Sequence, residues 1–220
     1  MLFRSGSFVQ TDWKLTPQFT LSAGLRYEAQ TNLSDYNNFD PRFGFAYQLG
    51  KNTVLRGGGG VFHQRLNTNN LDQLIRLDGT RQLQIVILNP SYPNPFLNGS
   101  AQATPISLRV RAEDLAAPYN VNSSVTLEQK ISNSLGLTLS YDSIRGLHLF
   151  RSRNINAPLV GSLLRPDPSK GNVNQLESTG LSRSNNISIG FRENLPAAWN
   201  LNIFGNYTLG RNMNDTDGAF

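Results

Sequence analysis

Apolar and polar residues alternate over segments of about ten residues, and this alternation limits what the chain can fold into more than any other feature of the sequence. The clearest segment runs from Phe19 to Gln30, where odd positions are apolar or aromatic and even positions are polar or glycine. A β-strand points successive side chains to opposite faces, so the segment predicts a strand with one apolar and one polar face. About ten residues is also what a tilted strand needs to cross a bilayer.

The same alternation recurs along most of the chain. Eight strands are predicted, at residues 3–13, 19–30, 41–49, 53–64, 119–131, 135–144, 185–194 and 199–209. Their connectors alternate in length, with short turns at 14–18, 50–52, 132–134 and 195–198 and long loops at 31–40, 65–118 and 145–184. Outer-membrane β-barrels alternate short periplasmic turns with long extracellular loops in this way. We therefore expect an all-β chain, an antiparallel up-and-down meander that forms one partial transmembrane barrel domain over residues 1–220.

Aromatic residues collect near the ends of these strands. Two aromatic girdles flanking an apolar band are typical of outer-membrane barrels. The predicted girdle residues beside the short turns are Trp13, Phe19, Tyr47 and Trp199, and those toward the long loops are Tyr27, Tyr141 and Tyr207.

Charged residues within the strands fall on the polar parity, with Glu193 at a strand end as the main exception. A barrel interior accepts charges that the lipid face does not. The residues predicted to face the lumen are Arg26, Glu28, Arg42, Arg56, Glu128, Lys130, Asp142 and Arg192.

Composition narrows the alternatives. Hydrophobic residues make up 38% and charged residues only 16%, so uncharged polar residues cover the polar faces. No apolar run reaches the eighteen or so residues of a membrane-spanning helix. The absence of cysteine removes disulfides, thiolate nucleophiles and Cys-ligated zinc. The net charge of +5 comes from scattered Lys and Arg residues, so nucleic-acid binding is not indicated. The first six residues do not form a signal peptide, and an exported protein is expected to begin upstream.

No motif supports catalysis, a cofactor or a metal. The run Gly57 to Gly60 lacks the Lys-Ser/Thr and the helix of a phosphate-binding loop, and instead suggests a bend or the close approach of another backbone, such as a plug inside a barrel. His63 and His148 stand alone in the sequence. The tail from Asn212 to Gly218 is rich in oxygen ligands but lacks the spacing of a calcium loop. We expect a protein that is not an enzyme.

The predicted loop at 65–118 is unusually long, and we expect it to have a structural or functional role. It contains an alternating stretch from Arg81 to Leu88, followed by a Pro- and Asn-rich segment that ends at Pro95. Loops of this length without regular structure are uncommon and usually functional. The stretch is either a hairpin that extends the barrel wall or a loop that contacts a ligand, and the two are compatible.

Several segments together resemble TonB-dependent receptors, most closely the Oar-like receptors. The first is FVQTDWKLTPQFTL at 8–21 with GLRYE at 24–28, which resembles a strand-turn-strand segment of that family. The second is DPRFGFAY at 40–47 with TVLRGG at 53–58, and the third is SIRGLHL at 143–149 with NIN at 154–156. Two local departures are Gly59, where the family often has Tyr, and Ser123, where it often has Trp.

The resemblance implies a barrel of about 22 strands in the cell outer membrane of a Gram-negative-type cell, of which this chain holds eight. It also implies energy-coupled uptake of an extracellular ligand that the sequence does not identify, driven by the TonB complex through a plug domain absent from this chain. The lumen-facing arginines would then bond to the plug or to neighbouring wall groups, or remain solvated wall charges.

Two other architectures stay open at this point. Eight strands can close on themselves into a small outer-membrane anchor or adhesin barrel, in which the first strand pairs with the last. A soluble β-sandwich binding module also shows alternating strands, because one face of each sheet lies in its core.

Overall fold

The structure is a computed structural model that describes residues 3–31, 33, 35–66, 68–82, 86–102, 105–195 and 201–216. The chain divides into two compact units. The first comprises Met1–Arg65, Ala116–Leu149 and Thr179–Thr216, and the second comprises Leu66–Leu115, Phe150–Ser178 and Asp217–Phe220. Each unit is described by itself.

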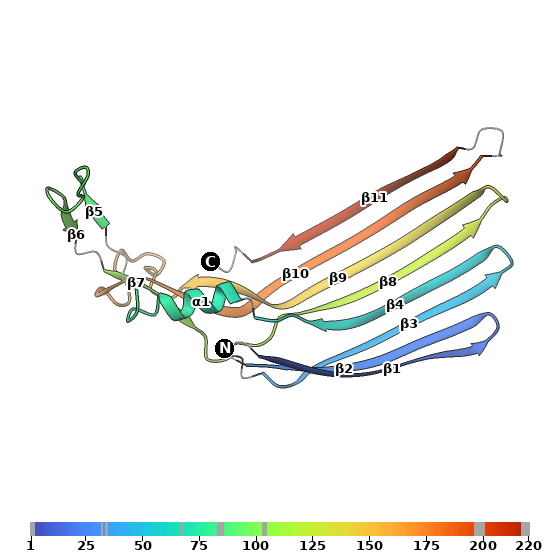
Figure 1. The fold of residues 1–220 in the computed structure, drawn as a ribbon, viewed down its shortest axis with the longest axis horizontal. Helices are drawn as coiled ribbons and strands as arrows, with labels where there is room; N and C mark the ends of the chain where they lie inside the picture. Colours follow the sequence, from blue (N-terminus) through green and yellow to red (C-terminus); the bar gives the residue numbers. More distant parts are fainter. Residues whose placement is uncertain are drawn as a thin grey trace. The chain divides into compact units, whose positions relative to one another are not determined.

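The first unit is built on one antiparallel sheet whose strands follow one another in sequence order (Figure 1). The order is β1-β2-β3-β4-β8-β9-β10-β11. These strands are β1 (Arg4–Thr16), β2 (Phe19–Gln30), β3 (Asn38–Gly50), β4 (Thr53–His63), β8 (Tyr119–Lys130), β9 (Leu135–Asn154), β10 (Lys170–Asn194) and β11 (Asn202–Asn214). Residues 150–154 of β9 and 170–178 of β10 belong to the second unit. The predicted meander is therefore confirmed.

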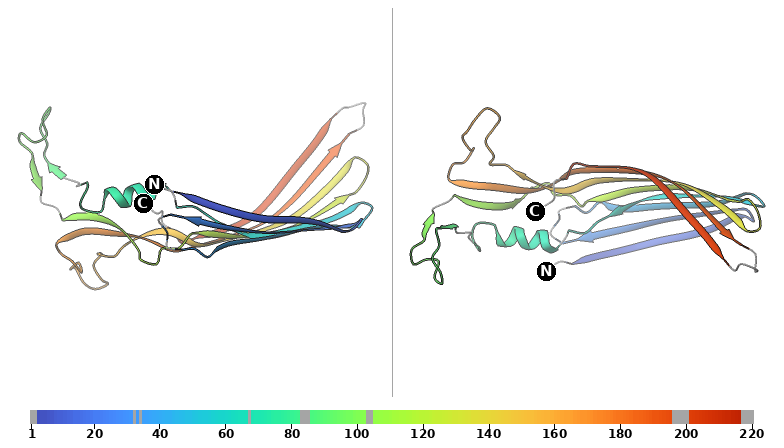
Figure 2. Two further views of the ribbon diagram at one scale, coloured as in Figure 1. Left: turned by 60° about the horizontal axis from the view of Figure 1, so that its bottom comes forward. Right: turned by 90° about the horizontal axis from the view of Figure 1, so that it is seen from above.

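The sheet is curved but open (Figure 2). Strands β1 and β11 stand at the two ends of the pairing order, and no pairing joins them in the described part of the chain. A closed eight-stranded barrel would pair these two strands, so that alternative is not the observed architecture. A second packed sheet, which a sandwich requires, does not occur among the described strands of the first unit.

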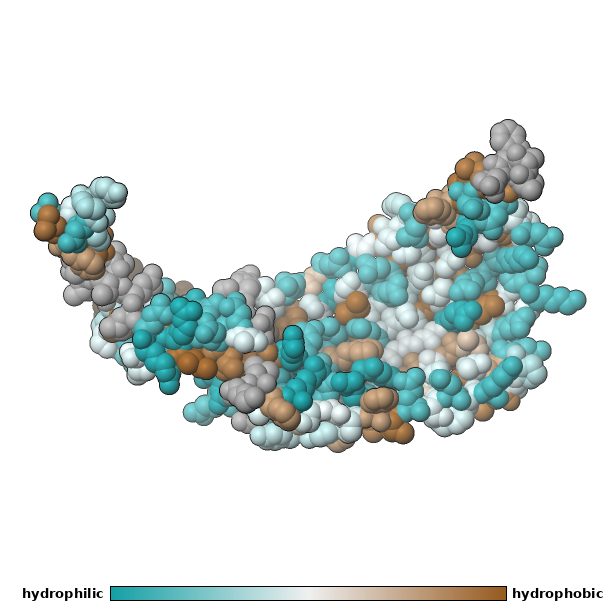
Figure 3. Space-filling model, in the orientation of Figure 1, coloured by the Kyte–Doolittle hydropathy of each residue, from teal (hydrophilic) through white to brown (hydrophobic). Residues whose placement is uncertain are grey.

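Cross-strand register keeps like faces together. Leu55 pairs with Leu127, and Leu127 in turn pairs with Leu139. These apolar side chains lie on one face, where Leu139 is 47% exposed. A soluble domain would bury such a continuous apolar surface, whereas a barrel presents it to lipid. The face turned to the viewer in Figure 3 is largely hydrophilic over the strands.

Two predicted loop boundaries are wrong. Strand β9 continues to Asn154 and β10 begins at Lys170, so most of the predicted loop 145–184 is strand. The alternation ends near His148, which has a positive φ of 54°. One residue outside the extended conformation changes which face the following residues point to. The regular alternation of apolar and polar residues therefore does not continue past His148, and the rest of the strand cannot be recognised from it. Strand β3 similarly begins at Asn38, inside the predicted loop 31–40.

The second unit contains regular structure where the sequence predicted the loop 65–118. It holds α1 (Thr68–Arg76), β5 (Val86–Leu88), β6 (Ser100–Gln102) and β7 (Ile106–Arg111). Strands β5 and β6 form a separate antiparallel pair, while β7 runs parallel to the beginning of β10. Of the alternating stretch from Arg81 to Leu88, residues 83–85 lie outside the described residues. Helix α1 is short, and within the described ranges no helix is long and apolar enough to span a membrane.

The second unit contains a small apolar core and a buried asparagine, Asn156, that makes several hydrogen bonds. Leu66, Leu115 and Leu176 are buried, and Ala112 donates its backbone N–H to Leu176 O at 2.9 Å. The buried Asn156 amide donates to the backbone oxygens of Asp167, Lys170 and Gly171 at 2.8–3.1 Å. One amide therefore holds the connection between β9 and β10 closed.

Candidate functional site: a buried polar network at the ends of β1 to β4

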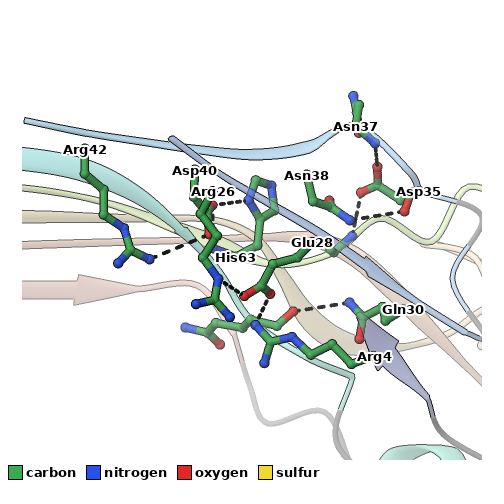
Figure 4. A network of polar contacts seen from close by, with 12 residues as sticks. Arg4, Arg26, Glu28, Gln30, Asp35, Asn37, Asn38, Asp40, Arg42 and His63 are labelled. Carbon is green, nitrogen blue, oxygen red and sulfur yellow. Dashed lines mark hydrogen bonds and ion pairs between the residues drawn. The ribbon is translucent and has the colours of Figure 1, made fainter. Parts of the chain in front are cut away.

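A cluster of charged and amide side chains lies where β1 to β4 reach their longer connections (Figure 4). Cross-strand pairing brings them together, because Arg4 pairs with Gln30, and Arg26 pairs with Asp40. Glu28 lies opposite Gly6 on one side and Asn38 on the other. Two-residue spacing along each strand then puts these side chains on one face. The sequence predicted Arg26, Glu28 and Arg42 for this face.

Glu28 is the centre of the first half of the network. It is 5% exposed and accepts hydrogen bonds from the guanidinium groups of Arg4 and Arg26. Gly6 lies against this arrangement, and a Cβ there would make ordinary contacts, 3.4 Å from Arg26 Nη2 and 3.6 Å from Glu28 Cγ. A carboxylate this deeply buried requires paired charges, and the two arginines provide them.

Asp40 is the centre of the second half. Only 1% exposed, it accepts the backbone N–H of His63 at 3.1 Å, and its Oδ1 lies 2.6 Å from His63 Nδ1. Arg42 approaches the other carboxylate oxygen at 4.0 Å. His63 looked isolated in the sequence, but the sheet supplies the carboxylate from 23 residues earlier in the chain. No group of three or more metal-binding side chains occurs among the described residues.

Amide groups extend the network to the connecting segments. Gln30 Nε2 donates to Gln64 O at 3.4 Å, and Asn38 Nδ2 donates to Asp35 O at 3.1 Å. The Asp35 carboxylate accepts the backbone N–H of Ala117 at 2.9 Å. One acceptor is left over, since Asn38 Oδ1 is buried without a hydrogen-bond partner among the described residues. A buried acceptor of this kind calls for a donor from outside the described residues, such as water or another protein segment.

The other predicted lumen residues lie on the same polar face. Arg56 Nε donates to Glu128 Oε1 at 3.0 Å across β4 and β8. Asp142 borders a depression with Arg42, Gly58 and Asn122. Glu128, Lys130 and Arg192 border a second depression. That this face lines the lumen remains a prediction.

The glycine run is explained by neighbours within the sheet. A Cβ on Gly57 or Gly59 would meet the ring of Phe45 or Phe43. A Cβ on Gly58 would lie 2.8 Å from Phe43 O. Close backbone neighbours at these glycines thus come from β3 and from β8, since a Cβ on Gly59 would lie 2.8 Å from Asn122 O. The expected bend does not interrupt β4.

Aromatic side chains gather at both strand ends, as the girdle prediction requires. Phe19 and Tyr47 make an edge-to-face contact with ring centroids 5.8 Å apart, and Tyr27 lies 5.0 Å from Phe39. Trp13, Tyr141 and Tyr207 are exposed. Trp199 lies outside the described residues. The role of these residues as membrane girdles stays a prediction.

A stack of three rings was not predicted from the sequence. Tyr119 lies between His63 and His148, with ring centroids 5.0 and 5.6 Å away. The three residues come from β4, β8 and β9, and only the register of the sheet brings them together. The rings are tilted by 39° at each contact, and the contacts link the ends of the three strands next to the Asp40–His63 pair.

Comparison with solved structures agrees with the fold. The outer membrane transporter YddB from Escherichia coli matches at a TM-score of 0.64 with 15% identity, covering 95% of this chain and 25% of that one. The siderophore receptor PirA from Pseudomonas aeruginosa matches at 0.63 with 15% identity, covering 97% and 35%. The FrpB iron transporter from Neisseria meningitidis matches at 0.60 with 13% identity, covering 97% and 26%.

The chain thus spans about a quarter to a third of the length of these transporters and receptors. A search of curated proteins finds no match. The model of the family described as "Outer membrane beta barrel domain" matches residues 33–220. With an apolar strand face, a polar opposite face and an open meander already established, this match shows that the chain belongs to the outer membrane beta barrel domain family and lies in the outer membrane.

Proposed function

We propose that the chain is a segment of the barrel wall of a TonB-dependent receptor, which takes up an extracellular ligand in an energy-coupled step. The observation that carries the proposal is the polar network on the inner face, in which buried Glu28 and Asp40 are paired but Asn38 Oδ1 has no partner among the described residues. Residues of this chain already bury and pair the two carboxylates, whereas Asn38 Oδ1 still needs a donor. We assign that donor to a plug domain that packs against this face of the wall.

The open edges of the sheet support the same proposal. Strands β1 and β11 each leave one row of backbone groups without a strand partner in the described part of the chain. Further wall strands would satisfy these rows in a barrel of about 22 strands. The resemblance of residues 8–28 and 40–58 to TonB-dependent receptors points to the same assembly.

The ligand class to test first follows from the similar structures. PirA is described as a siderophore receptor and PfeA from Pseudomonas aeruginosa as a ferric enterobactin receptor. Ferric siderophores are therefore the first candidates for uptake by the whole receptor. The partners in the proposal are outer-membrane lipid, the TonB complex through a plug outside this chain, and that ligand.

Photocrosslinking in the full-length receptor tests the wall assignment. A benzophenone amino acid is placed at Arg42, on the polar face, or at the neighbouring Phe43, on the apolar face. We expect the Arg42 position to crosslink to a receptor segment outside residues 1–220, identified by mass spectrometry, and the Phe43 position to crosslink to lipid. Crosslinks from Arg42 to residues of this chain alone would contradict a plugged barrel.

Uptake of radiolabelled ferric enterobactin by cells with and without TonB tests the energy coupling. We expect uptake to require both the receptor and TonB, while binding at the cell surface requires the receptor alone. Receptor-dependent uptake that persists without TonB would contradict the coupling and leave the wall assignment intact.

A further inference from the structure

Three arginines lie on the apolar face of the sheet, where the sequence predicted a loop or the end of a strand. They are Arg145 on β9, Arg183 on β10 and Arg211 on β11. Arg183 pairs with Met213, and Arg211 pairs with Asn185. Each arginine is an even number of residues from the apolar residues of its own strand, Ile187 on β10 and Leu209 on β11, so both arginines lie on the apolar face. Arg145 pairs with Val121 of β8, on the face that carries Leu127 and Leu139.

Side-chain contacts place Arg145 beside Arg183. Asn185 Oδ1 accepts hydrogen bonds from Tyr141 Oη at 3.1 Å and Ser143 Oγ at 3.0 Å, which joins these rows of β9 and β10. Two residues beyond Ser143 on β9 is Arg145, and two residues before Asn185 on β10 is Arg183. Because the strands are antiparallel, these two steps lead in the same direction, and the two arginines lie side by side on that face. Both arginines also border one depression together with Leu147, Leu181 and Met213.

The height of the three arginines fits the headgroup layer. Arg145 lies four residues beyond Tyr141, about 13 Å along the strand. Tyr141 belongs to the predicted girdle on the side of the long loops, which is extracellular in barrels of this class. The apolar residues Leu137 and Leu139 precede it on the same face. The arginines therefore lie just beyond the apolar band, at the level of the outer leaflet.

The cluster carries positive charge that the described protein does not neutralise. Arg145, Arg183 and Arg211 are exposed and form no hydrogen bond or ion pair with a described residue. The one acidic side chain described at this depression is Asp215, whose Oδ1 accepts the backbone N–H of Leu181 at 2.5 Å. Like charges side by side on a lipid-facing surface are stabilised by a bound anion.

We propose that Arg145, Arg183 and Arg211 form a binding site for the phosphate group of an anionic lipid of the outer leaflet. The planar guanidinium group binds phosphate through two parallel hydrogen bonds. Ile187 and Leu209 lie in the same rows on the membrane side of the arginines and offer an exposed apolar surface to the acyl chain of the same molecule. A free anion would use the arginines but not these apolar side chains, so the combination selects a lipid.

Lipid binding by the full-length receptor in neutral detergent tests this site, with native mass spectrometry as the readout. The probe is lipid A carrying both phosphates, compared with the same lipid after removal of the phosphates. We expect the wild-type receptor to bind the phosphorylated form at least about tenfold more tightly, since each charge-assisted hydrogen bond corresponds to about that change in affinity.

The variant pair separates the site from general charge effects. Arg145→Gln with Arg183→Gln removes two positive charges from the apolar face, and Arg56→Gln with Arg192→Gln removes two from the polar face. We expect the first pair to weaken binding of phosphorylated lipid A by about tenfold or more, and the second pair to leave it within about twofold. Heat-modifiable gel mobility reports whether each variant is folded.

Three results would overturn the proposal. Equal losses in the two variant pairs would reduce the effect to net charge, and equal binding of the dephosphorylated lipid would remove the phosphate from recognition. Displacement of the lipid by inorganic phosphate at the same concentration would identify a free-anion site. The comparison of phosphorylated with dephosphorylated lipid A and the competition with inorganic phosphate both use the wild-type receptor. They test the proposal even if the variant of the apolar face does not fold.

Discussion

The ring of Phe45 lies over Gly57, its cross-strand partner, so that a Cβ on Gly57 would be 2.6 Å from Phe45 Cε1. The same relation joins Phe191 to Gly205, where a Cβ would be 2.5 Å from Phe191 Cε1. At Gly59 the Phe43 ring lies farther away, at 3.3 Å, and the nearest atom is Asn122 O at 2.8 Å. In the pairs Phe45–Gly57 and Phe191–Gly205 the aromatic ring takes the space that a second side chain would occupy. A ring laid over a glycine protects the backbone there and fixes the register of the two strands.

Replacing Gly57 by alanine is expected to destabilise the barrel by about 1 to 3 kcal/mol, because the Phe45 ring must leave its position. Combining it with Phe45→Ala should recover part of that loss, since a Gly57 Cβ would still lie 3.2 Å from Ser124 O. Urea unfolding of the full-length receptor in lipid vesicles measures both. Gly136→Ala is the control, because a Cβ there meets nothing within 4 Å. Strict additivity of Gly57→Ala and Phe45→Ala would show that the ring contact is not the cause.

Adjacent positions of β9 test the assignment of the two faces. Leu139→Arg puts a charge on the apolar face and is expected to cost about 2 to 4 kcal/mol near the bilayer midplane. Thr138→Arg adds the same charge opposite Glu128, which provides a partner on the polar face. We expect normal folding for Thr138→Arg and impaired assembly for Leu139→Arg, by heat-modifiable mobility. The reverse order would exclude the proposed orientation of the sheet.

The burial of Glu28 predicts an unequal pair of glutamate variants. Glu28→Gln leaves Arg4 and Arg26 without their shared carboxylate and is expected to cost about 1 to 3 kcal/mol. Glu128→Gln breaks a bridge to Arg56 in which both side chains are exposed, and its cost should stay below about 1 kcal/mol. Chemical unfolding of the two receptors compares them directly. A larger loss for Glu128→Gln would contradict the role given to burial.

Removing the Asn156 amide should open the connection between β9 and β10. Asn156→Ala deletes the donor to three backbone oxygens and the acceptor for Asp167 N at 2.8 Å. We expect faster amide hydrogen exchange over residues 156–171, with no change in β1 to β4. The neighbouring Ile155→Ala is the control, since Ile155 contributes a backbone bond to Val173 that this substitution retains. Unchanged exchange would show that other contacts hold this connection.

Much of the sheet follows from the sequence because its strands alternate cleanly. The segment 19–30 was predicted with both boundaries correct, since its two faces differ at every position. The extensions of β9 and β10 were not, because His148 interrupts the alternation in β9, and the added part of β10 carries Val173, Leu176 and Leu181 without a regular period of two. The parallel pairing of β7 with β10 depends on contacts between distant segments, which no local pattern encodes.

The candidate site was predicted only in part, for a related reason. Arg26, Glu28 and Arg42 were found because they obey the parity of their strands. The Asp40–His63 contact and the stack around Tyr119 depend on register between strands, which the sequence does not state. The arginines at 145, 183 and 211 were missed because correct strand boundaries are needed before their face can be assigned.

The pairs Phe45–Gly57 and Phe191–Gly205 also restrict how this protein can change over generations. A glycine under a ring cannot gain a side chain unless the ring opposite becomes smaller, and a ring cannot shrink without leaving a hollow beside a bare backbone. A substitution at one residue of such a pair therefore requires a substitution at the other. Among relatives of this chain, residues 45 and 57, and residues 191 and 205, should be substituted together or not at all.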